Sequence, residues 1–141
     1  MEDKIRVIDF QVLTKHYKTY RDGVDKIDAK KKEILEELEP YKTELNNLFK
    51  SERDAKIDLQ IQTVSEKALE LEKGYKEELK KMSESLNEKC YNELSDIITE
   101  WSKENDIDIV IGKMEVVYCK SKNDITTKIL DEIKKIDMFI D

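Results

Sequence analysis

The stretch that decides the fold runs from Ile57 to Trp101 and reads IDLQIQTVSEKALELEKGYKEELKKMSESLNEKCYNELSDIITEW. Apolar residues recur along it at spacings of three and four, which is the pattern of a helix that buries one narrow face. These positions are Ile57, Ile61, Val64, Ala68, Leu71, Tyr75, Leu79, Met82, Leu86, Cys90, Leu94, Ile97 and Trp101. At about 1.5 Å per residue, a helix over residues 54–104 would be roughly 75 Å long, so we expect a rod and not part of a compact globule.

A second amphipathic helix is predicted from Val24 onward. Its apolar face consists of Val24, Ile27, Ile34, Leu38, Tyr41, Leu45 and Leu48, with Lys31 as one interruption. Pro40 should kink this helix without ending it, because the apolar spacing continues across the proline. A polar group at residues 50–54 then separates the two helices. We therefore expect a helical hairpin over residues 23–104, with coiled-coil packing and its tip near residues 50–54.

Three positions are predicted to let this hairpin arm flex. Gly23 follows Asp22 and marks a bend at which the first helix begins. Pro40 removes one backbone hydrogen bond from its helix. Gly74 weakens the longer helix by about 1 kcal/mol relative to alanine. We interpret Gly23, Pro40 and Gly74 as the hinge of the arm.

Both ends of the chain have the pattern of β-structure. Residues 4–10 read as a short strand rich in β-branched residues. Two further runs, residues 107–111 and 114–119, are joined by Gly112-Lys113, which predicts a hairpin with a type II′ turn. Strands this short are not stable alone. We therefore expect residues 1–22 and 105–141 to form one β-rich body, in which the strands pair with each other and with those of further copies.

Two signals bound the helices near the C-terminal end. Asn105 is expected to stop the long helix, because asparagine tolerates the left-handed conformation. Asn123 or Asp124 should cap a last helix. That helix presents Ile125, Ile129, Ile133 and Ile136 on one side. The predicted fold class is α+β, mostly α: a long antiparallel helical hairpin attached to a small β-body.

The composition agrees with long, solvent-exposed helices. Charged residues make up 42% of the 141 residues, and there are only three glycines and one proline. A monomer of this kind buries little core, so we expect self-association to contribute to its stability. The net charge of −7 disfavours general nucleic-acid binding, which requires a basic surface.

No complete set of catalytic or metal-binding residues is found in the sequence. His16 is the single histidine, and the three glycines are isolated, so neither a histidine metal site nor a phosphate-binding loop is predicted. Catalytic carboxylates need a desolvated pocket, whereas the pairs Glu36-Glu37 and Glu77-Glu78 fall on solvated helix faces. The Asp106-Ile107-Asp108 group lacks the remaining ligands of a calcium loop. We expect no enzymatic activity, no cofactor and no metal.

The cellular compartment is predicted from three features: membrane spans, a signal peptide and the use of cysteine. No apolar run reaches the roughly 20 residues of a membrane span, and no signal peptide precedes the first strand. Cys90 and Cys119 form no recognisable motif and read as free thiols. The expectation is a cytoplasmic protein, with the periplasm as the alternative if the sequence is a mature form whose leader has been removed.

The order of elements and both chain ends resemble one known family. The similar residues are Asp3-Lys4-Ile5-Arg6-Val7-Ile8 at the start, Asp106-Ile107-Asp108-Ile109-Val110, Val116-Val117-Tyr118, and Asp124-Ile125-Thr126 at the opening of the last helix. In these residues the chain resembles the Skp/OmpH family of periplasmic chaperones. The likeness in topology covers nearly the whole chain, and the likeness in residue detail is specific at the two ends.

This resemblance implies a jellyfish-like homotrimer, in which helical tentacles extend from a β-rich trimerisation body. It implies an ATP-independent holdase that cages unfolded outer-membrane proteins and performs no chemistry. Virion proteins are a second class of client that we consider for a chain working in the cytoplasm. The residues expected to build the trimer body are Ile5, Val7, Ile8, Ile107, Ile109, Val110, Ile111, Val116, Val117, Tyr118, Ile125 and Ile129. Tyr17 and Tyr20 near the base and Phe49 near the tip are candidates for contact with clients.

Two other functions fit the same sequence. A coiled-coil spacer or adaptor of a virion or envelope assembly would need the same helices. An acidic mimic that occupies a basic partner surface would explain the net charge of −7. Suppression of aggregation without ATP distinguishes the chaperone from the spacer, and a salt-sensitive one-to-one complex would indicate the mimic.

Overall fold

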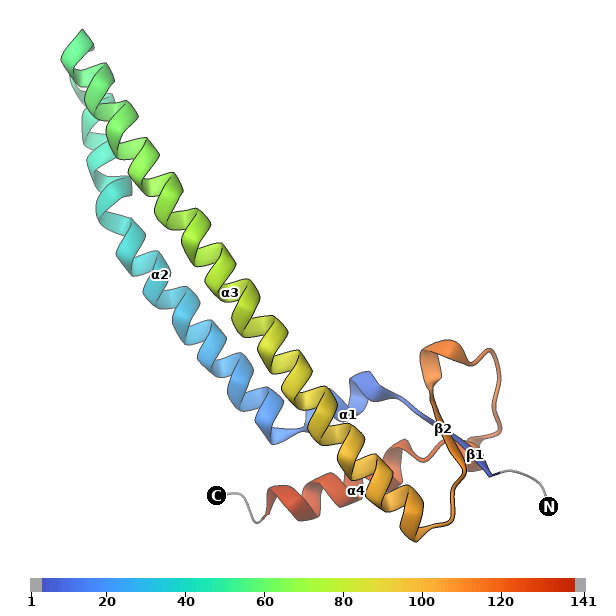
Figure 1. Cartoon of the computed structure of the whole chain (residues 1–141). Coiled ribbons are helices and arrows are strands. Elements are labelled where there is room, and N and C mark those ends of the chain that lie inside the picture. Colours follow the sequence, from blue (N-terminus) through green and yellow to red (C-terminus); the bar gives the residue numbers. More distant parts are fainter. Residues whose placement is uncertain (1–3, 139–141) are drawn as a thin grey trace. The chain divides into compact units, whose positions relative to one another are not determined.

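The structure is a computed structural model that describes residues 4–138 (Figure 1). In chain order its elements are β1 (Ile5–Ile8), α1 (Phe10–His16), α2 (Lys18–Lys50), α3 (Ala55–Glu104), β2 (Ile109–Gly112), the 3-10 turns η1 (Lys113–Glu115) and η2 (Ser121–Asn123), and α4 (Thr126–Asp137). They form two compact units. The arm unit is residues 24–84, and the strand unit is the described part of residues 1–23 and 85–141. Each unit is described by itself below.

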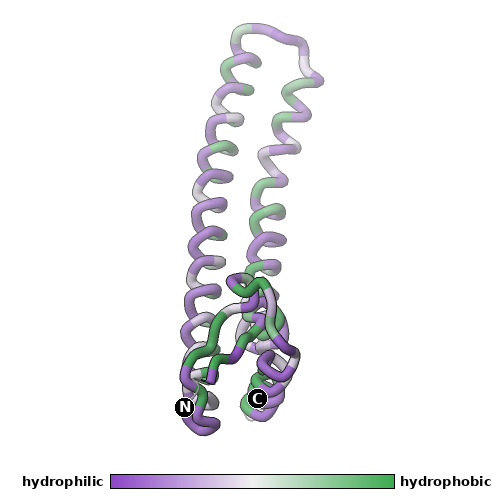
Figure 2. The backbone as a smooth tube through the Cα atoms, turned by 90° about the vertical axis from the view of Figure 1, so that its right-hand side faces the viewer, coloured by the Kyte–Doolittle hydropathy of each residue, from purple (hydrophilic) through white to green (hydrophobic). Residues whose placement is uncertain are grey.

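The arm unit is a pair of amphipathic helical segments from α2 and α3, as the sequence predicts. Ile27, Ile34 and Val64 are buried in its seam. The other predicted seam positions of the arm unit are half-buried, and Lys31 is exposed. Figure 2 shows the two segments side by side, with hydrophobic residues recurring at intervals along mostly hydrophilic helices. The narrow apolar seam therefore accounts for the pairing.

Polar contacts across the arm unit join residues of the two helices. Lys30 Nζ lies 3.3 Å from Glu78 Oε1, and the Tyr75 hydroxyl donates to the Glu37 carboxylate. The Glu78 side chain raises the pKa of Lys30 above its usual value. Exposed ion pairs contribute little stability, so these contacts fix the pairing register more than they hold the helices together.

The connection between the two helices lies at residues 51–54, within the predicted tip. Asp54 caps the start of α3, because its Oδ1 accepts a hydrogen bond of 2.8 Å from the backbone amide of Ile57. Arg53 Nε lies 2.8 Å from Asp58 Oδ1 in the first turn. The polar residues at the tip therefore connect the two helices of the hairpin and cap the start of the second one, α3.

Helix α2 continues through Pro40, as predicted from the unbroken apolar spacing. A shallow hollow of about 690 Å³ lies beside the proline and is lined by α2 and the start of the tip. Gly74 lies inside α3 with open space around it. The role of Pro40 and Gly74 as hinges stays a prediction.

The strand unit contains a two-stranded parallel sheet. β1 and β2 pair in the register Ile5 with Ile109 and Val7 with Ile111. Parallel strands need a long crossover connection, and here the crossover is α1, α2 and α3 together. The first strand and the C-terminal strand thus meet each other, as the sequence analysis expects.

One hydrophobic core holds this unit together. It combines residues of β1, α1, the C-terminal part of α3 and α4. The buried members are Ile8, Leu13, Tyr17, Cys90, Leu94, Ile98, Ile125, Ile129 and Ile133. The predicted last helix is present, and Ile125, Ile129 and Ile133 are its buried side while Ile136 is half-buried. Residues 85–104 of α3 belong to this unit, so the domain boundary predicted after residue 104 falls inside it.

The hairpin predicted over residues 107–119 is wrong. Gly112 has φ −65° and ψ 138°, whereas a type II′ turn needs a positive φ at its first central residue. η1 follows β2 directly, and residues 116–120 form no strand. β2 pairs with β1 instead. The alternating pattern marked the strand correctly but did not identify its partner.

The end of α3 also differs from the prediction. Asp106, and not Asn105, takes the left-handed conformation, with φ 54°. The amide of Ile107 donates to the carbonyl of Ser102 over 2.9 Å, and the amide of Asp106 donates to that of Lys103 over 3.4 Å, which together form a Schellman motif. Asn105 contributes differently, since its Nδ2 donates to the Trp101 carbonyl over 2.8 Å.

The bend predicted at Asp22-Gly23 is wrong as well. The helical backbone breaks at Tyr17, and α2 passes through Gly23 without interruption. A Cβ atom at Gly23 would lie 2.2 Å from Leu86 Cδ1 and 3.0 Å from its Cγ. Glycine is therefore needed here so that α2 and α3 approach each other closely within the strand unit.

The two helical glycines should respond in opposite ways to alanine. Gly74→Ala meets nothing within 4 Å and should raise the free energy of unfolding by about 1 kcal/mol through helix propensity. Gly23→Ala gains the same propensity but overpacks Leu86, which costs about 1–3 kcal/mol. Urea unfolding at one protein concentration measures the difference. Leu86→Ala in the Gly23→Ala background should relieve the clash; equal stabilities for the two single variants would contradict the close approach.

Candidate interaction surface

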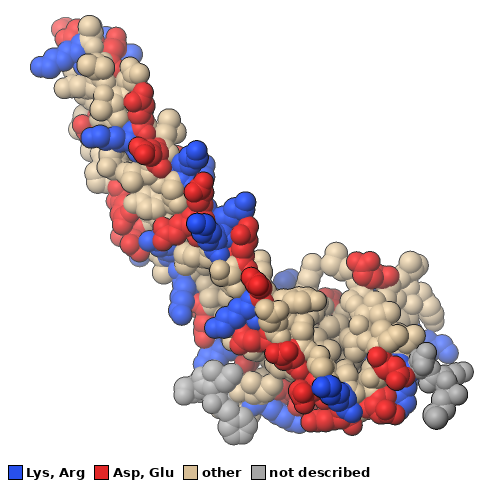
Figure 3. Space-filling view, in the orientation of Figure 1, with Lys and Arg blue, Asp and Glu red and all other residues tan. Residues whose placement is uncertain are grey.

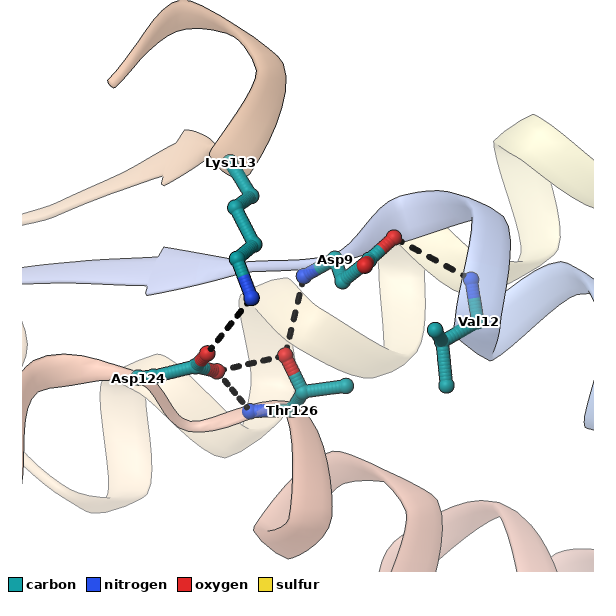
Figure 4. A network of polar contacts seen from close by, with 5 residues as sticks. All are labelled: Asp9, Val12, Lys113, Asp124 and Thr126. Atoms are coloured by element: carbon teal, nitrogen blue, oxygen red, sulfur yellow. Dashed lines mark hydrogen bonds and ion pairs between the residues drawn. The ribbon is translucent and has the colours of Figure 1, made fainter. Parts of the chain in front are cut away.

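The N-terminal strand and the last helix are tied together by a polar network (Figure 4). The Thr126 hydroxyl accepts a hydrogen bond of 2.9 Å from the Asp9 amide and donates to Asp124 Oδ1. Asp9 Oδ1 in turn accepts from the Val12 amide at the start of α1 over 3.3 Å. Lys113 Nζ lies 3.8 Å from Asp124 Oδ2. The network fixes η1 and the starts of α1 and α4 around the end of β1.

Protonation of Asp124 should weaken this network. Burial raises the pKa of Asp124, but hydrogen bonds from the hydroxyl and amide of Thr126, helped by Lys113, outweigh it and leave the pKa below its usual value. A carboxyl with a lowered folded-state pKa stabilises the fold above its unfolded pKa of about 4, and this stability is lost as the pH falls through the lower, folded value.

We therefore expect Asp124→Asn to reduce the acid dependence of stability. Wild type should lose more free energy of unfolding than the variant as the pH falls from neutrality to below about 4. Unfolding by urea across this pH range measures it. Glu115→Gln is the control, because Glu115 lies on the neighbouring turn and is exposed. Parallel pH profiles for wild type and Asp124→Asn would contradict the role of the ionised carboxylate.

Tyr17 and Tyr20, two of the three residues predicted to contact clients, both pack against the core of the strand unit. Tyr17 is 3% exposed, and its hydroxyl donates to Glu93 Oε1 over 3.2 Å. Burial raises the pKa of Tyr17, and the nearby Glu93 raises it further. Tyr20 is half-buried and packs against the same core. Tyr17 thus has no surface to offer a client. The reason is the spacing of three and four from Phe10 through Leu13 to Tyr17, which marks one buried face.

Phe49 remains a candidate for client contact. Its ring is 55% exposed, and the Arg53 guanidinium carbon lies 5.9 Å from the ring centre. An exposed ring beside a cation offers both an apolar and a cation–π contact. Its place is the C-terminal end of α2, one residue before the tip begins.

The two cysteines are free thiols, as predicted. Cys90 is 1% exposed, and burial raises its pKa. A buried thiol with a raised pKa is unreactive. Cys90 is therefore not a reactive thiol in this arrangement. Cys119 is half-buried.

The residues predicted to build the trimer body fall into three sets. Val7, Ile8, Ile125 and Ile129 are at most 4% exposed and pack inside the single chain. Ile107, Val110, Ile111 and Val116 are half-buried. Ile5, Ile109, Val117 and Tyr118 are exposed, at 43%, 46%, 105% and 77%. Only the second and third sets have apolar surface left over for another copy.

Sequence reasoning missed both exposed and core residues of this unit. Met114, in η1, is 83% exposed and adds to the apolar surface near Val117 and Tyr118. Leu13 and Ile98 are buried in the core. The signals for the core residues were present, because Leu13 follows Phe10 by three and Ile98 follows Leu94 by four. No pattern in the sequence marks Met114.

Uncharged surface gathers over the strand unit, whereas acidic and basic side chains alternate over the arm unit (Figure 3). A groove of about 730 Å³ runs along β2 and the C-terminal part of α3. Its lining includes the apolar side chains of Phe10, Tyr91, Ile98, Ile107, Ile109 and Val110. Exposed apolar residues and an apolar groove on one unit are features of a protein-binding surface.

Residues 4–138 contain no group of three or more His, Cys, Asp or Glu side chains placed to hold a metal ion. Over the same residues, no helix has both the length and the apolar character that crossing a membrane requires.

Known proteins resemble this chain both at the level of a sequence family and at the level of the fold. Residues 4–133 match the family described as Outer membrane protein (OmpH-like). The fold is similar to a crystal structure of an OmpH-like protein from Caulobacter crescentus CB15, named as a candidate outer membrane chaperone, with a TM-score of 0.73. The two share 13% sequence identity, and the match covers 96% of this chain and 86% of that one. No curated protein sequence is similar enough to count as a relative.

Proposed function

Because the chain belongs to the OmpH-like family of outer membrane proteins, we propose that it is a chaperone that holds unfolded client proteins without ATP. Three copies associate through their strand units, and the arms surround one client. The resemblance to the Skp/OmpH family and the structural neighbour's name support the chaperone role. The clients are unfolded proteins with exposed apolar segments, such as outer-membrane or virion proteins.

The observation that carries this proposal is that the two units expose different kinds of surface. The arm unit has a narrow seam and a charged exterior, with isolated apolar residues such as Leu35 at 68% and Leu69 at 65% exposed. Contacts of this kind are individually weak. Weak contacts repeated along several arms hold a client by multivalency while each one can still release. The exposed apolar residues of the strand unit are available for association between copies.

Suppression of aggregation tests this function. An unfolded β-barrel membrane protein is diluted out of urea with a substoichiometric amount of the chain, counted as trimer, and without nucleotide. We expect light scattering by the client to fall, and ATP to change nothing. Unchanged scattering, together with stable co-purification of one folded partner, would contradict the holdase and favour a structural spacer.

The charge of the chain gives this assay an internal control. At −7 the protein repels acidic clients and attracts basic ones over a Debye length of about 8–10 Å. If apolar contacts dominate, suppression should persist at high salt. Complete loss of suppression at high salt would instead indicate an acidic mimic that binds basic surfaces.

The cellular compartment is a further part of the proposal. We propose that the chain works where its unfolded clients are, in the periplasm if a leader is removed and in the cytoplasm otherwise. Fractionation of cells that express the native gene, with detection by an antibody against the chain, distinguishes the two.

A further inference from the structure

A second hollow of the strand unit, of about 920 Å³, is lined by basic side chains. We call it the basic hollow, and its four cations are Lys4, Arg6, Lys120 and Lys122. Among the described residues, no aspartate or glutamate lines it. The whole chain has 33 acidic and 26 basic residues, so this lining is the reverse of the overall composition. Like charges around one hollow repel each other and attract an anion.

A parallel bridge between Val7 and Asp124 brings the cations together from the two ends of the chain. The amide of Ile125 donates to the carbonyl of Val7 over 2.9 Å, which holds the two segments in this register. Because the bridge is parallel, the residues that precede Asp124 run along those that precede Val7. Lys120 and Lys122 therefore line the same hollow as the two basic residues of the N-terminal segment.

The cations of the basic hollow have few partners within the protein. Within the described part of the chain, no ion pair involves Arg6, Lys120 or Lys122. The guanidinium of Arg6 donates one N–H to a backbone carbonyl over 2.9 Å and keeps its other donors available. Lys4 Nζ lies 3.8 Å from Asp106 Oδ2, but that carboxylate is 93% exposed, and such a pair is weak.

The shape of the basic hollow also favours a small ligand. Its volume of about 920 Å³ falls within the range of small-molecule sites, about 300–1,000 Å³. The rest of its lining is mostly apolar and includes Ile5, Val7, Ile111, Val116 and Tyr118. Apolar walls concentrate the field of the cations inside the hollow. A concave lining suits a compact anion that enters it, whereas a bilayer presents its charge as a broad surface.

We propose that the basic hollow binds a free anion with two or more phosphate groups. Arginine offers phosphate oxygens a planar fork of N–H donors, and lysine offers them a point charge. The hollow is far larger than one phosphate ion, so linked phosphate groups suit it better, because they meet cations of both chain segments. This site goes beyond the proposed holdase function and does not depend on it.

Isothermal titration calorimetry of the full chain with inorganic tripolyphosphate tests the site. We expect one anion to bind per chain, with an affinity that falls as salt rises. Lys122→Gln and Arg6→Gln should each raise the Kd by about tenfold or more, since each removes a charged hydrogen-bond donor. Lys122 is exposed, so its replacement should leave the fold unchanged, as circular dichroism can verify.

Lys128→Gln is the matched control. Lys128 is exposed on α4 in the same unit, makes the same change in net charge and does not line the basic hollow. Its Kd for tripolyphosphate should equal that of wild type. An equal loss of affinity in Lys128→Gln and Lys122→Gln would mean that the anion responds only to net charge, and it would overturn the inference.

Two further ligands separate the sources of the phosphate group. Inorganic phosphate should bind at least about tenfold more weakly than tripolyphosphate, because it meets fewer of the cations. Vesicles of phosphatidylglycerol carry the phosphate group on a lipid surface, with phosphatidylcholine vesicles as their control. Binding to phosphatidylglycerol vesicles that Lys122→Gln abolishes, without binding of tripolyphosphate, would identify a lipid headgroup as the ligand and overturn the inference.

The remaining outcomes concern the protein's own carboxylates and the proposed function. Glu2 and Asp3 precede Lys4 in the sequence. Binding that appears only after the combined change Glu2→Gln and Asp3→Asn would mean that these carboxylates occupy the basic hollow, and it would overturn the inference. A chain that binds tripolyphosphate as predicted but does not suppress aggregation would contradict the holdase and leave the anion site standing.

Discussion

Replacing Leu94 by alanine should lower the free energy of unfolding of the strand unit by about 2–5 kcal/mol. Leu94 is 0% exposed and lies in the core cluster that combines α3 with α1, β1 and α4. Removing most of its side chain forfeits burial of apolar surface and leaves a cavity that rigid helices fill poorly. A loss of this size is a large part of the stability of a small domain.

The measurement is urea unfolding at one fixed protein concentration, because association also stabilises the folded chain. Leu69→Ala is the matched control: it makes the same chemical change on the same helix, but at a side chain that is 65% exposed. Its effect should stay within about 0.5 kcal/mol. Similar losses for the two variants would mean that position 94 does not lie in a packed core.

Replacing Pro40 by alanine should stabilise the arm unit by about 3 kcal/mol, the cost of proline inside a helix. Proline has no amide to donate to the carbonyl four residues earlier, and its ring crowds that carbonyl. Pro40 lies in the middle of α2 and is exposed, so alanine restores the bond without disturbing a core. Hydrogen exchange should slow at the amides of the turn that contains residue 40.

The same variant tests whether Pro40 is a hinge. Glu39→Ala is the control, because it changes the neighbouring exposed residue and leaves the proline in place. If α2 bends at Pro40, Pro40→Ala should alter the small-angle scattering profile and narrow the size range of clients that are held. Unchanged scattering and an unchanged client range, with slower exchange alone, would make Pro40 a local weak point and not a hinge.

The arm unit was predictable because its signal is repeated many times. One apolar residue every three or four positions specifies a helix face, and the seam from Ile57 to Trp101 repeats it over the length of α3. Local patterns determine local structure. The cap predicted at Asn123 or Asp124 is wrong, because Ile125 takes the N-cap position of α4 and makes no side-chain cap hydrogen bond. Asp124 lies one residue earlier and accepts a hydrogen bond from the amide of Thr126.

The strand unit was harder because its contacts join distant segments. The alternation at residues 107–111 identifies a strand, yet its partner β1 lies about a hundred residues earlier in the chain. The nearest strand-like run, residues 114–119, made a hairpin the natural prediction. Gly23 is similar: its dipeptide with Asp22 reads as a turn, and nothing nearby in sequence reveals Leu86 against it.

The residues predicted to build the trimer body also differ in a property that depends on distant segments, namely their exposure. Four of them have apolar side chains that are exposed: Ile5, Ile109, Val117 and Tyr118. Periodicity alone does not reveal this exposure. Val7 and Ile129 have the same kind of side chain but are buried in their own chain. Which apolar residues of a strand unit remain for a partner depends on how α4 and α3 cover the sheet, and that is a property of the tertiary fold.

The caging of a client by three copies can be tested by native mass spectrometry of the chain mixed with an unfolded outer-membrane β-barrel protein. We expect a complex of three chains, each of 16.7 kDa, with one client molecule, formed without nucleotide. A single chain bound to the client, or a trimer that binds none, would contradict it.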